Sequence, residues 1–284
     1  MQRYKILHRT YYNYSGEVKL GPHTLRLRPR EDHELRIESS TLNITPPAIL
    51  HWCRDVEGNS VATATFDVPA SQLVFESEVI IQHFNEAPLE FLVANYAIEY
   101  PFAYQPDDKI LLEPYITLAE STSEDVLRKW VANIWQAGDQ VQTYVLLQRL
   151  NTHIHQSLTY QLREEFGVQT VAETLSLGTG SCRDFAYLFM EAARRLGLAS
   201  RFVSGYLHAP PSTVDYGATH AWAEVYLPGA GWKGFDPSCG EIVGTKHIAV
   251  AVARLPESVP PIAGSFVGPP GSELYVGVWV TELV

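Results

Sequence analysis

Residues 178–184 read Gly178-Thr179-Gly180-Ser181-Cys182-Arg183-Asp184, and this stretch leads from a loop broken by glycines into a helix. The apolar residues that follow have the i, i+3, i+4, i+7 spacing of one buried helix face. They are Phe185, Leu188, Phe189, Ala192, Ala193 and Leu196. Ser181 can cap this helix, Asp184 can complete a capping-box-like pair, and Gly197 can end it. Cys182 is therefore expected at the first helical position.

The expected position of Cys182 suggests nucleophilic chemistry. The first N–H groups of a helix lack partners within the helix, and together with the helix dipole they favour an anion. A thiol in that field gains thiolate character, and the thiolate is the nucleophile. The alternative is a buried structural cysteine, because free cysteine is among the most buried residue types. The choice depends on whether the chain supplies Cys182 with catalytic partners.

Composition bounds the class of protein. The chain has 284 residues, of which 46% are hydrophobic, so it can form one large or two ordinary domains. A net charge of -11 argues against nucleic acid or an anionic membrane as the partner. No run approaches the roughly 20 apolar residues that span a bilayer. Residues 1–6 lack the apolar core of a signal peptide, so we expect a cytoplasmic protein.

The three cysteines and ten histidines show no metal pattern. Cys53, Cys182 and Cys239 are odd in number and far apart, which fits neither a disulfide framework nor a zinc ribbon. His220 and His247 do not have zinc-ligand spacing relative to these cysteines, and no calcium loop of the EF-hand type is present. We expect no metal and no other cofactor.

Hydrophobic patterning predicts an α+β fold in three parts. Residues 1–85 contain short alternating segments and turns, which favour an antiparallel β-sandwich domain. Residues 86–122 are rich in proline and aromatic residues and are expected to form a packed connector. Residues 123–284 begin with helical periodicity, continue through the Cys182 helix, and then show strand patterns up to a last strand at 274–280. This third part is the candidate catalytic core.

The segment 219–226 alternates as a strand and carries a candidate base. His220 and Trp222 fall on one face of this strand, and Ala221 and Ala223 fall on the other. A cysteine nucleophile needs a base that accepts and returns a proton, and histidine is the usual one. The alternative is that His220 is a polar cross-strand residue with no catalytic role.

The next strand, 232–237, supplies a carboxylate at Asp236, just before Pro237. A five-residue loop at 227–231 would place Asp236 opposite Trp222 and diagonal to His220 on the same face. A three-residue loop at 227–229 would place Asp236 directly opposite His220. A four-residue loop would send Asp236 to the other face unless a bulge intervened. Asp236 could instead be a turn residue, but a helix-terminal cysteine with His and Asp on a hairpin matches papain-type geometry in general terms.

Four motifs in order carry a family resemblance. They are Gly180-Ser181-Cys182-Arg183-Asp184-Phe185-Ala186, Arg201-Phe202-Val203-Ser204-Gly205-Tyr206, Thr219-His220-Ala221-Trp222-Ala223-Glu224-Val225 and Gly231-Trp232-Lys233-Gly234-Phe235-Asp236-Pro237. This set resembles the core of the bacterial transglutaminase-like cysteine protease family. The first 85 residues resemble the N-terminal β domain of that family, through residues 8–14, 25–29 and 55–59. The resemblance implies a papain-like, transglutaminase-like core in which the nucleophile's helix packs on an antiparallel sheet.

The resemblance also implies the roles of the triad. Cys182 would be the nucleophile, His220 the base and acid, and Asp236 the residue that orients the histidine. Two segments depart from the family pattern. Ser238-Cys239-Gly240 stands where Thr-Asn-Gly is common, and Ala253-Arg254-Leu255-Pro256-Glu257 stands where relatives commonly show Gly-Arg-Asp. Both leave the substrate preference open.

The expected function is cysteine-dependent acyl transfer on a peptide or carboxamide, through a thioester intermediate. Three outcomes remain open from sequence. Water can take the acyl group, as in a peptidase or amidase, which the resemblance favours. An amine can take it, as in a protein-glutamine transglutaminase. The chain can also be a non-catalytic peptide-binding module. In each case the partner is a peptide or protein, and the oligomeric state is undetermined.

Further contacts to substrate are expected near the triad. The N–H of Cys182 is a candidate oxyanion donor, and Tyr160 is a candidate for the second donor, although a core tyrosine is the alternative. Trp222 could form a wall of the site or belong to the core. The loop at 209–217 could frame a peptide cleft or be an ordinary surface loop.

Overall fold

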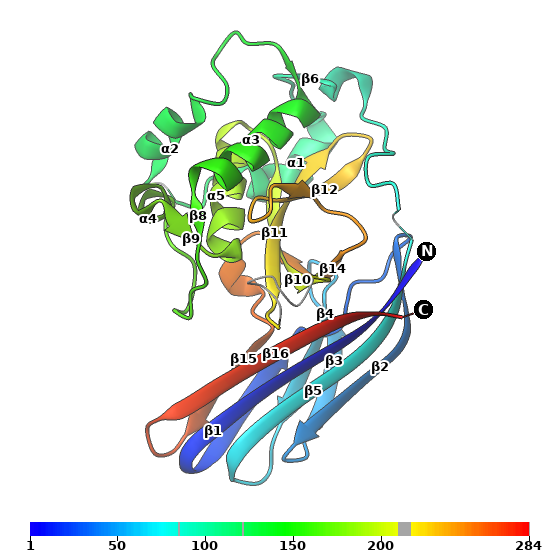
Figure 1. Cartoon of the computed structure of the whole chain (residues 1–284), viewed down its shortest axis with the longest axis vertical. Helices are drawn as coiled ribbons and strands as arrows, with labels where there is room; N and C mark the ends of the chain where they lie inside the picture. Colours follow the sequence, from blue (N-terminus) through cyan, green and yellow to red (C-terminus); the bar gives the residue numbers. More distant parts are fainter. Residues whose placement is uncertain (85, 121, 210–216, 284) are drawn as a thin grey trace.

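The computed structural model describes residues 1–84, 86–120, 122–209 and 217–283. A mixed part with all the labelled helices lies at one end of the molecule, and long strands form the other end (Figure 1). The predicted α+β fold class is confirmed. The helices are η1 (Asn95–Ala97), α1 (Pro106–Ile116), α2 (Glu124–Val131), α3 (Thr143–Ser157), α4 (Val171–Leu177), α5 (Cys182–Arg195) and η2 (Pro256–Ser258).

The strands form one sheet system at each end and two short pairs. They are β1 (Gln2–Leu25), β2 (Leu35–Thr45), β3 (Ile49–Arg54), β4 (Ser60–Thr65), β5 (Ala70–His83), β6 (Glu99–Tyr100), β7 (Val141–Gln142), β8 (Thr159–Tyr160), β9 (Thr179–Gly180), β10 (Ser200–Leu207), β11 (His220–Leu227), β12 (Gly231–Asp236), β13 (Glu241–Ile242), β14 (His247–Ala253), β15 (Ile262–Val267) and β16 (Ser272–Leu283).

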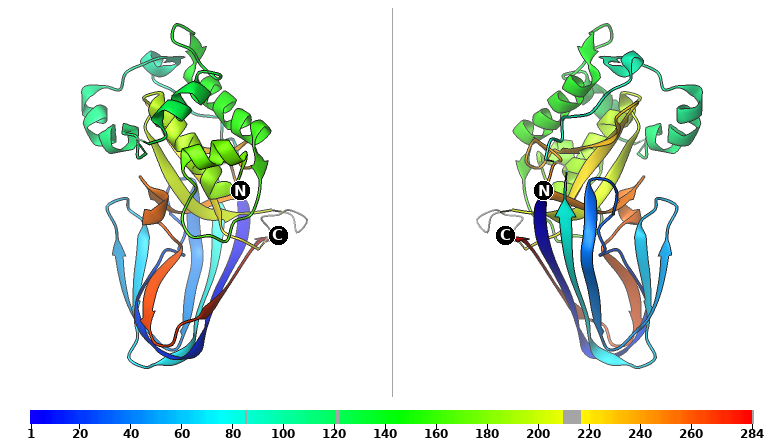
Figure 2. Two further views of the ribbon diagram at one scale, coloured as in Figure 1. Left: turned by 90° about the vertical axis from the view of Figure 1, so that its left-hand side faces the viewer. Right: turned by 90° about the vertical axis from the view of Figure 1, so that its right-hand side faces the viewer.

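The long strand β1 takes part in both layers of the N-terminal part. Its first half lies between β5 and β16, and its second half lies between β4 and β15. Two strand layers face each other in Figure 2. Side chains of both halves, such as Tyr14 and Leu25, pack with Phe75 of β5 and Ala64 of β4. These contacts form the apolar interior of the predicted sandwich.

The core sheet has the order β13-β12-β11-β10-β14, and helix α5 packs on one face of it. Ala221, Ala223 and Val225 project from β11 toward Phe185 and Phe189 of α5, which are fully buried. The apolar periodicity after Cys182 therefore marks a real packing face. This packing fixes the start of α5 beside the start of β11.

The opposite face of the core sheet packs on the N-terminal part. Tyr206 and Ile248 contact Ile6 and Val79 in one buried cluster. The Asn59 side chain adds two hydrogen bonds of 2.8 Å to the backbone N–H and C=O of Val252. The two parts are therefore joined by apolar packing and by hydrogen bonds from a side chain to the backbone.

One expectation for the chain's organisation is corrected. Residues 262–283 were expected in the core, but β15 and β16 pair with β1 and complete the N-terminal sheets. The connector at 86–122 contains helix α1 at Pro106–Ile116. Proline suits the first position of a helix, where its missing N–H has no partner to lose.

Within the described ranges, no helix is long and apolar enough to cross a membrane. The expected cytoplasmic location stays a prediction.

Candidate active site

Helix α5 begins at Cys182, as the sequence predicts. The preceding residue, Ser181, is extended, and Asp184 accepts hydrogen bonds from its backbone N–H (2.8 Å) and its hydroxyl (2.7 Å). The predicted pairing of Ser181 with Asp184 is present, and it holds the turn that presents Cys182. Gly197 follows the helix with a φ of 78°, a conformation that favours glycine.

Asp184 is fully buried and also holds the loop 163–169 against the start of α5. Its second oxygen accepts from the Arg163 guanidinium and from the backbone N–H of Gln169, both at 2.7 Å. Burial alone would raise the pKa of this carboxyl. The hydrogen bonds from Gln169, Ser181 and Arg163 outweigh burial and lower it.

The β11–β12 hairpin has the register of the five-residue alternative. Tyr226 pairs with Trp232 and Ala223 with Phe235, so Asp236 lies diagonal to His220 on the same face. His220 Nε2 lies 2.7 Å from Asp236 Oδ2, and both side chains are fully buried. The predicted odd loop therefore brings base and carboxylate together.

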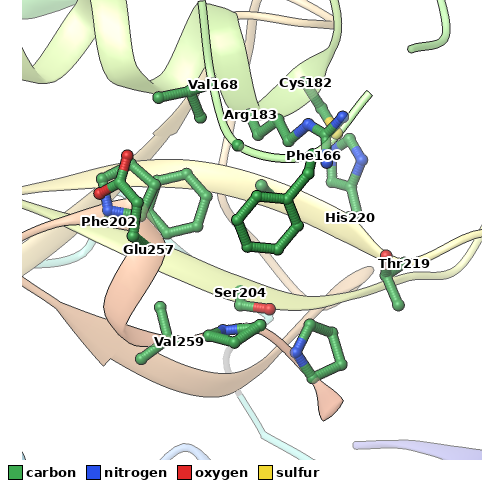
Figure 3. A pocket seen from close by; sticks show the side chains of 15 residues that line it. Phe166, Val168, Cys182, Arg183, Phe202, Ser204, Thr219, His220, Glu257 and Val259 are labelled. Carbon is green, nitrogen blue, oxygen red and sulfur yellow. The ribbon is translucent and has the colours of Figure 1, made fainter. Parts of the chain in front are cut away.

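His220 connects Asp236 to Cys182. Burial lowers the pKa of His220, but the charge and hydrogen bond of Asp236, together with the interaction with Cys182, raise it well above 6.5. The other ring nitrogen, Nδ1, is buried and has no well-formed hydrogen bond among the described residues. The Cys182 sulfur lies beside this imidazole (Figure 3). Catalytic hydrogen bonds are often long before substrate binds.

Asp236 has partners on both oxygens. Oδ1 accepts from the backbone N–H (3.0 Å) and the hydroxyl (2.6 Å) of Ser238, and Oδ2 accepts from His220 and from His247 Nε2 (3.0 Å). Burial would raise the pKa of Asp236, whereas the two histidines hold it well below 3.8. The carboxylate is therefore ionised and fixed in orientation.

His247 is a site residue that sequence reasoning missed. It lies on β14, and β10 and β11 separate that strand from β12. No local spacing links His247 to Asp236, so only the folded sheet brings them together. One candidate metal-ligand atom from each of His220, Asp236 and His247 lies within 4.8 Å of the other two. Both imidazoles stand at hydrogen-bond distance from the same carboxylate oxygen, and this arrangement fits direct hydrogen bonding.

A cavity of about 150 Å³ opens beside Cys182 and His220 (Figure 3). Apolar side chains form most of its wall. They are Phe166, Val168, Phe202, Val259, Pro260 and Pro261. Arg183, Ser204, Thr219 and Glu257 supply its polar groups. The cavity gives access from the surface to the thiol.

The two expected substrate contacts lie elsewhere. Trp222 is buried with Val203 and Val252, its ring lies edge-on to His247, and its placement fits the core alternative. Tyr160 pairs through its backbone with Gly180, and its ring packs edge-on against Phe185. Other residues form the wall of the cavity beside Cys182. Contact of either residue with a substrate stays a prediction.

Two further expectations concern the surroundings. Residues 210–216 of the predicted cleft loop lie outside the described residues. Cys239 is half-buried, and its thiol donates to the carbonyl oxygen of Asp236 at 3.7 Å. Burial, followed by the charge of Asp236, raises the pKa of Cys239 strongly. A thiol with a raised pKa forms little thiolate, so Cys239 is a poor nucleophile.

A helix-terminal cysteine facing a histidine and an aspartate on an antiparallel sheet defines a papain-like core. Comparison with known families makes the assignment specific. Residues 4–82 match the bacterial transglutaminase-like N-terminal region, and residues 129–237 match the transglutaminase-like superfamily. The chain belongs to the bacterial transglutaminase-like proteins, as its motifs indicate.

The chain is also similar to relatives, and shares its fold with a solved structure, along nearly its full length. An uncharacterized protein of Mycobacterium tuberculosis is 29% identical over 275 residues, which cover 92% of this chain and 87% of the relative. An uncharacterized protein of Mycobacterium leprae is 23% identical over the full length of both chains. A protein of Cytophaga hutchinsonii described as a "putative cysteine protease" shares the fold, with a TM-score of 0.74 and 16% identity over 100% of this chain and 91% of that one.

Proposed function

We propose that this protein hydrolyses peptide or carboxamide bonds through a thioester on Cys182. One geometric observation carries the proposal. Cys182 opens helix α5 beside the buried His220, and Asp236 lies 2.7 Å from the far nitrogen of that imidazole. A nucleophile, a base and an orienting carboxylate in series are the arrangement that covalent acyl transfer requires.

The first half of the reaction forms the acyl-enzyme. Cys182 Sγ bonds to the carbonyl carbon, and the thiol proton passes to His220 Nδ1. His220 returns this proton to the departing amine or ammonia as the C–N bond breaks. Asp236 keeps the imidazole oriented and stabilises its charged form, and the raised pKa of His220 supports that role. The product of this half is a thioester and a free amine or ammonia.

The second half releases the acyl group. His220 takes a proton from water, and the water oxygen bonds to the carbonyl carbon. The C–S bond then breaks and His220 returns the proton to the sulfur, which gives a carboxylic acid and the Cys182 thiol. Each half passes through an oxyanion that needs preorganised donors. The N–H of Cys182 belongs to the first turn of α5, where N–H groups lack helical partners, so we assign it as one donor.

The acyl acceptor is the point on which this proposal can fail. An amine in place of water would make the protein a transglutaminase. The non-catalytic alternative is disfavoured because nucleophile, base and carboxylate are all present and adjacent. We favour water as the acyl acceptor because the sequence motifs resemble those of cysteine proteases.

The test is a glutamine-containing peptide library incubated with and without a labelled primary amine. Mass spectrometry follows cleavage, ammonia release and amine incorporation in parallel. We expect cleavage or deamidation as the main product. Amine incorporation without cleavage would refute hydrolysis, and no product in any channel would favour the binding module.

Two cysteine variants assign the chemistry to one thiol. Cys182→Ala should abolish all product formation while the circular dichroism spectrum stays unchanged. Cys239→Ser should keep most activity, because Cys239 is a poor nucleophile and lies behind Asp236. Iodoacetamide should label Cys182 much faster than Cys239. Activity that survives Cys182→Ala contradicts the proposal.

A further inference from the structure

We infer that the cavity beside Cys182 receives one apolar side chain of the acyl donor, so that the substrate is a peptide cleaved after an apolar residue of the size of leucine or phenylalanine. This inference rests on the proposed function for its chemistry, but it concerns which substrate the site selects.

The wall of the cavity is apolar where it is deepest. Phe202 and Val259 are almost fully buried, and both line the cavity. Val168 and two consecutive prolines, Pro260 and Pro261, line it as well. A side chain that enters here exchanges water for hydrocarbon contacts.

The size of the cavity limits its occupant. An apolar cavity of about 150 Å³ can hold a benzene-sized group. The cavity beside Cys182 has about that volume, and it opens to the surface. One leucine or phenylalanine side chain fits this space, whereas two side chains do not.

Polar partners for a glutamine carboxamide are few. Ser204 and Thr219 line the cavity with one hydroxyl each, and the exposed Glu257 adds a carboxylate. The Arg183 Nη2 group is already occupied, because it donates to the carbonyl oxygens of Arg163 and Glu165, whereas Arg183 Nε has no partner among the described residues. A carboxamide needs two donors and one acceptor satisfied, and a buried polar group without partners is costly. The mainly apolar wall therefore favours an apolar side chain over glutamine.

The mouth of the cavity supplies a second, independent observation. Phe166 is 92% exposed and lines the cavity, and its ring stands over the space in Figure 3. Its loop is held in place, since Asp184 binds both Arg163 and the N–H of Gln169. An exposed aromatic ring at the mouth of an apolar cavity extends the apolar surface that a ligand can cover. A substrate side chain would cover this ring.

The test measures binding without turnover. Peptides of the form acetyl-Gly-X-Gly-Gly-amide, with X as leucine, phenylalanine, glutamine or aspartate, are titrated into the full-length Cys182→Ala protein by calorimetry. The leucine and phenylalanine peptides should bind about 10- to 100-fold more tightly than the aspartate and glutamine peptides, which corresponds to burial of one apolar side chain. Equal affinities, or no measurable binding of the leucine peptide at millimolar concentration, would overturn the inference.

A matched pair of loop variants locates the subsite. Phe166→Ala, made in the Cys182→Ala background, should weaken the leucine peptide several-fold and leave the aspartate peptide unchanged. Leu162→Ala is the control, because Leu162 is an exposed apolar residue of the same loop region and does not line the cavity. A Phe166→Ala protein that keeps the full preference for leucine would contradict the inference.

Hydrolysis of the same peptides by the wild-type protein separates the two proposals. Selective binding without hydrolysis would leave the subsite in place and refute the proposed function. Hydrolysis of all four peptides at equal kcat/KM would support the proposed function and refute the apolar subsite.

Discussion

At the scale of single residues, the proposed catalytic role of the site rests on the groups that surround His220. A histidine as deeply buried as this one would ordinarily lose its proton more easily. Asp236 reverses that tendency. His220 and His247 keep Asp236 ionised, and the hydrogen bonds from Ser238 and His247 hold its orientation. The site is therefore a connected set of buried polar groups in which each member depends on the next.

The pH profile of hydrolysis should report this coupling. His220 must be protonated to give a proton to the leaving amine, so kcat/KM should fall on the alkaline side at an apparent pKa above 6.5. Asp236→Asn removes the negative charge that raises the pKa of His220. We expect the alkaline limb to move to lower pH and kcat to fall by orders of magnitude. An alkaline limb that stays in place in Asp236→Asn would contradict the assignment.

His247 is predicted to act as a positioning residue for Asp236. His247→Leu removes one hydrogen bond to a charged group, worth about 1.5 kcal/mol or more, so kcat should fall about tenfold or more. KM for peptides should stay within about twofold, because His247 does not line the cavity.

His247→Gln provides the matched comparison for that prediction. Its amide N–H₂ can reach toward Asp236 as Nε2 does, so it should restore part of kcat. Equal loss in both variants, or a loss confined to KM, would mean that His247 has only a structural role. Steady-state kinetics of the three proteins gives this answer.

At the scale of elements, the start of α5 is held by a buried carboxylate as well as by apolar packing. Asp184 joins three segments, namely the turn at Ser181, the loop at 163–169 and the helix itself. The same helix carries a second buried ion pair at its other end, between Glu191 and Arg194, both 0% exposed. Polar groups that are buried in this way must be satisfied together, because a remaining unpaired charge is costly.

Asp184→Asn should therefore destabilise the protein. The change leaves the largely buried Arg163 guanidinium with only its longer, 3.5 Å pair to the exposed Glu165, and removing one member of a buried pair costs about 3 kcal/mol. Urea unfolding measures the loss. Asp125→Asn is the control, because the Asp125–Arg128 pair has nearly the same length but is exposed, and no measurable change is expected there. A similar response of the two variants would refute this account.

At the scale of the whole molecule, the first and last strands of the chain pair with each other. The last strands, β15 and β16, pair with the first strand, β1, so the N-terminal sheets are complete only when the C-terminal segment returns. The core sheet contacts these sheets through a buried histidine. His8 Nδ1 lies 3.1 Å from the Tyr206 hydroxyl, and His8 Nε2 lies 2.9 Å from the Thr10 hydroxyl.

Acid should weaken this contact between the two parts. Burial lowers the pKa of His8 to about 4 from its ordinary 6.5. Between these values the unfolded chain binds a proton that the folded chain does not, so stability falls as pH falls from 6.5 to 4. The shift corresponds to about 3 kcal/mol. His8→Gln should remove this part of the pH dependence in urea unfolding at pH 7 and pH 4.5.

An exposed histidine serves as the control for His8. His51→Gln, on the surface of β3, should keep the wild-type pH dependence. A His8→Gln protein with the same pH dependence as the wild type would contradict the prediction.

The sequence by itself determined the local parts of the site. The helix start at Cys182 followed from capping residues and apolar periodicity. Any odd loop between the two strands places Asp236 on the face of His220, and the structure decided between the three- and five-residue registers. The helix start and the odd loop are both short-range features, because helix ends and hairpin turns depend on neighbouring residues. For the same reason the sequence placed Cys182, His220 and Asp236 correctly relative to their own elements.

Only the tertiary structure decided the contacts that join distant segments. The Asn59 side chain pairs with the backbone of Val252, 193 positions further along the chain. The His247–Asp236 hydrogen bond, the burial of Trp222 in the core and the return of β16 to β1 belong to the same group. Residues that meet across several strands show no recognisable spacing in the sequence, because their proximity depends on the order of the strands in the sheet. The Cys182 helix was thus predictable, but the network that stabilises its partner histidine was not.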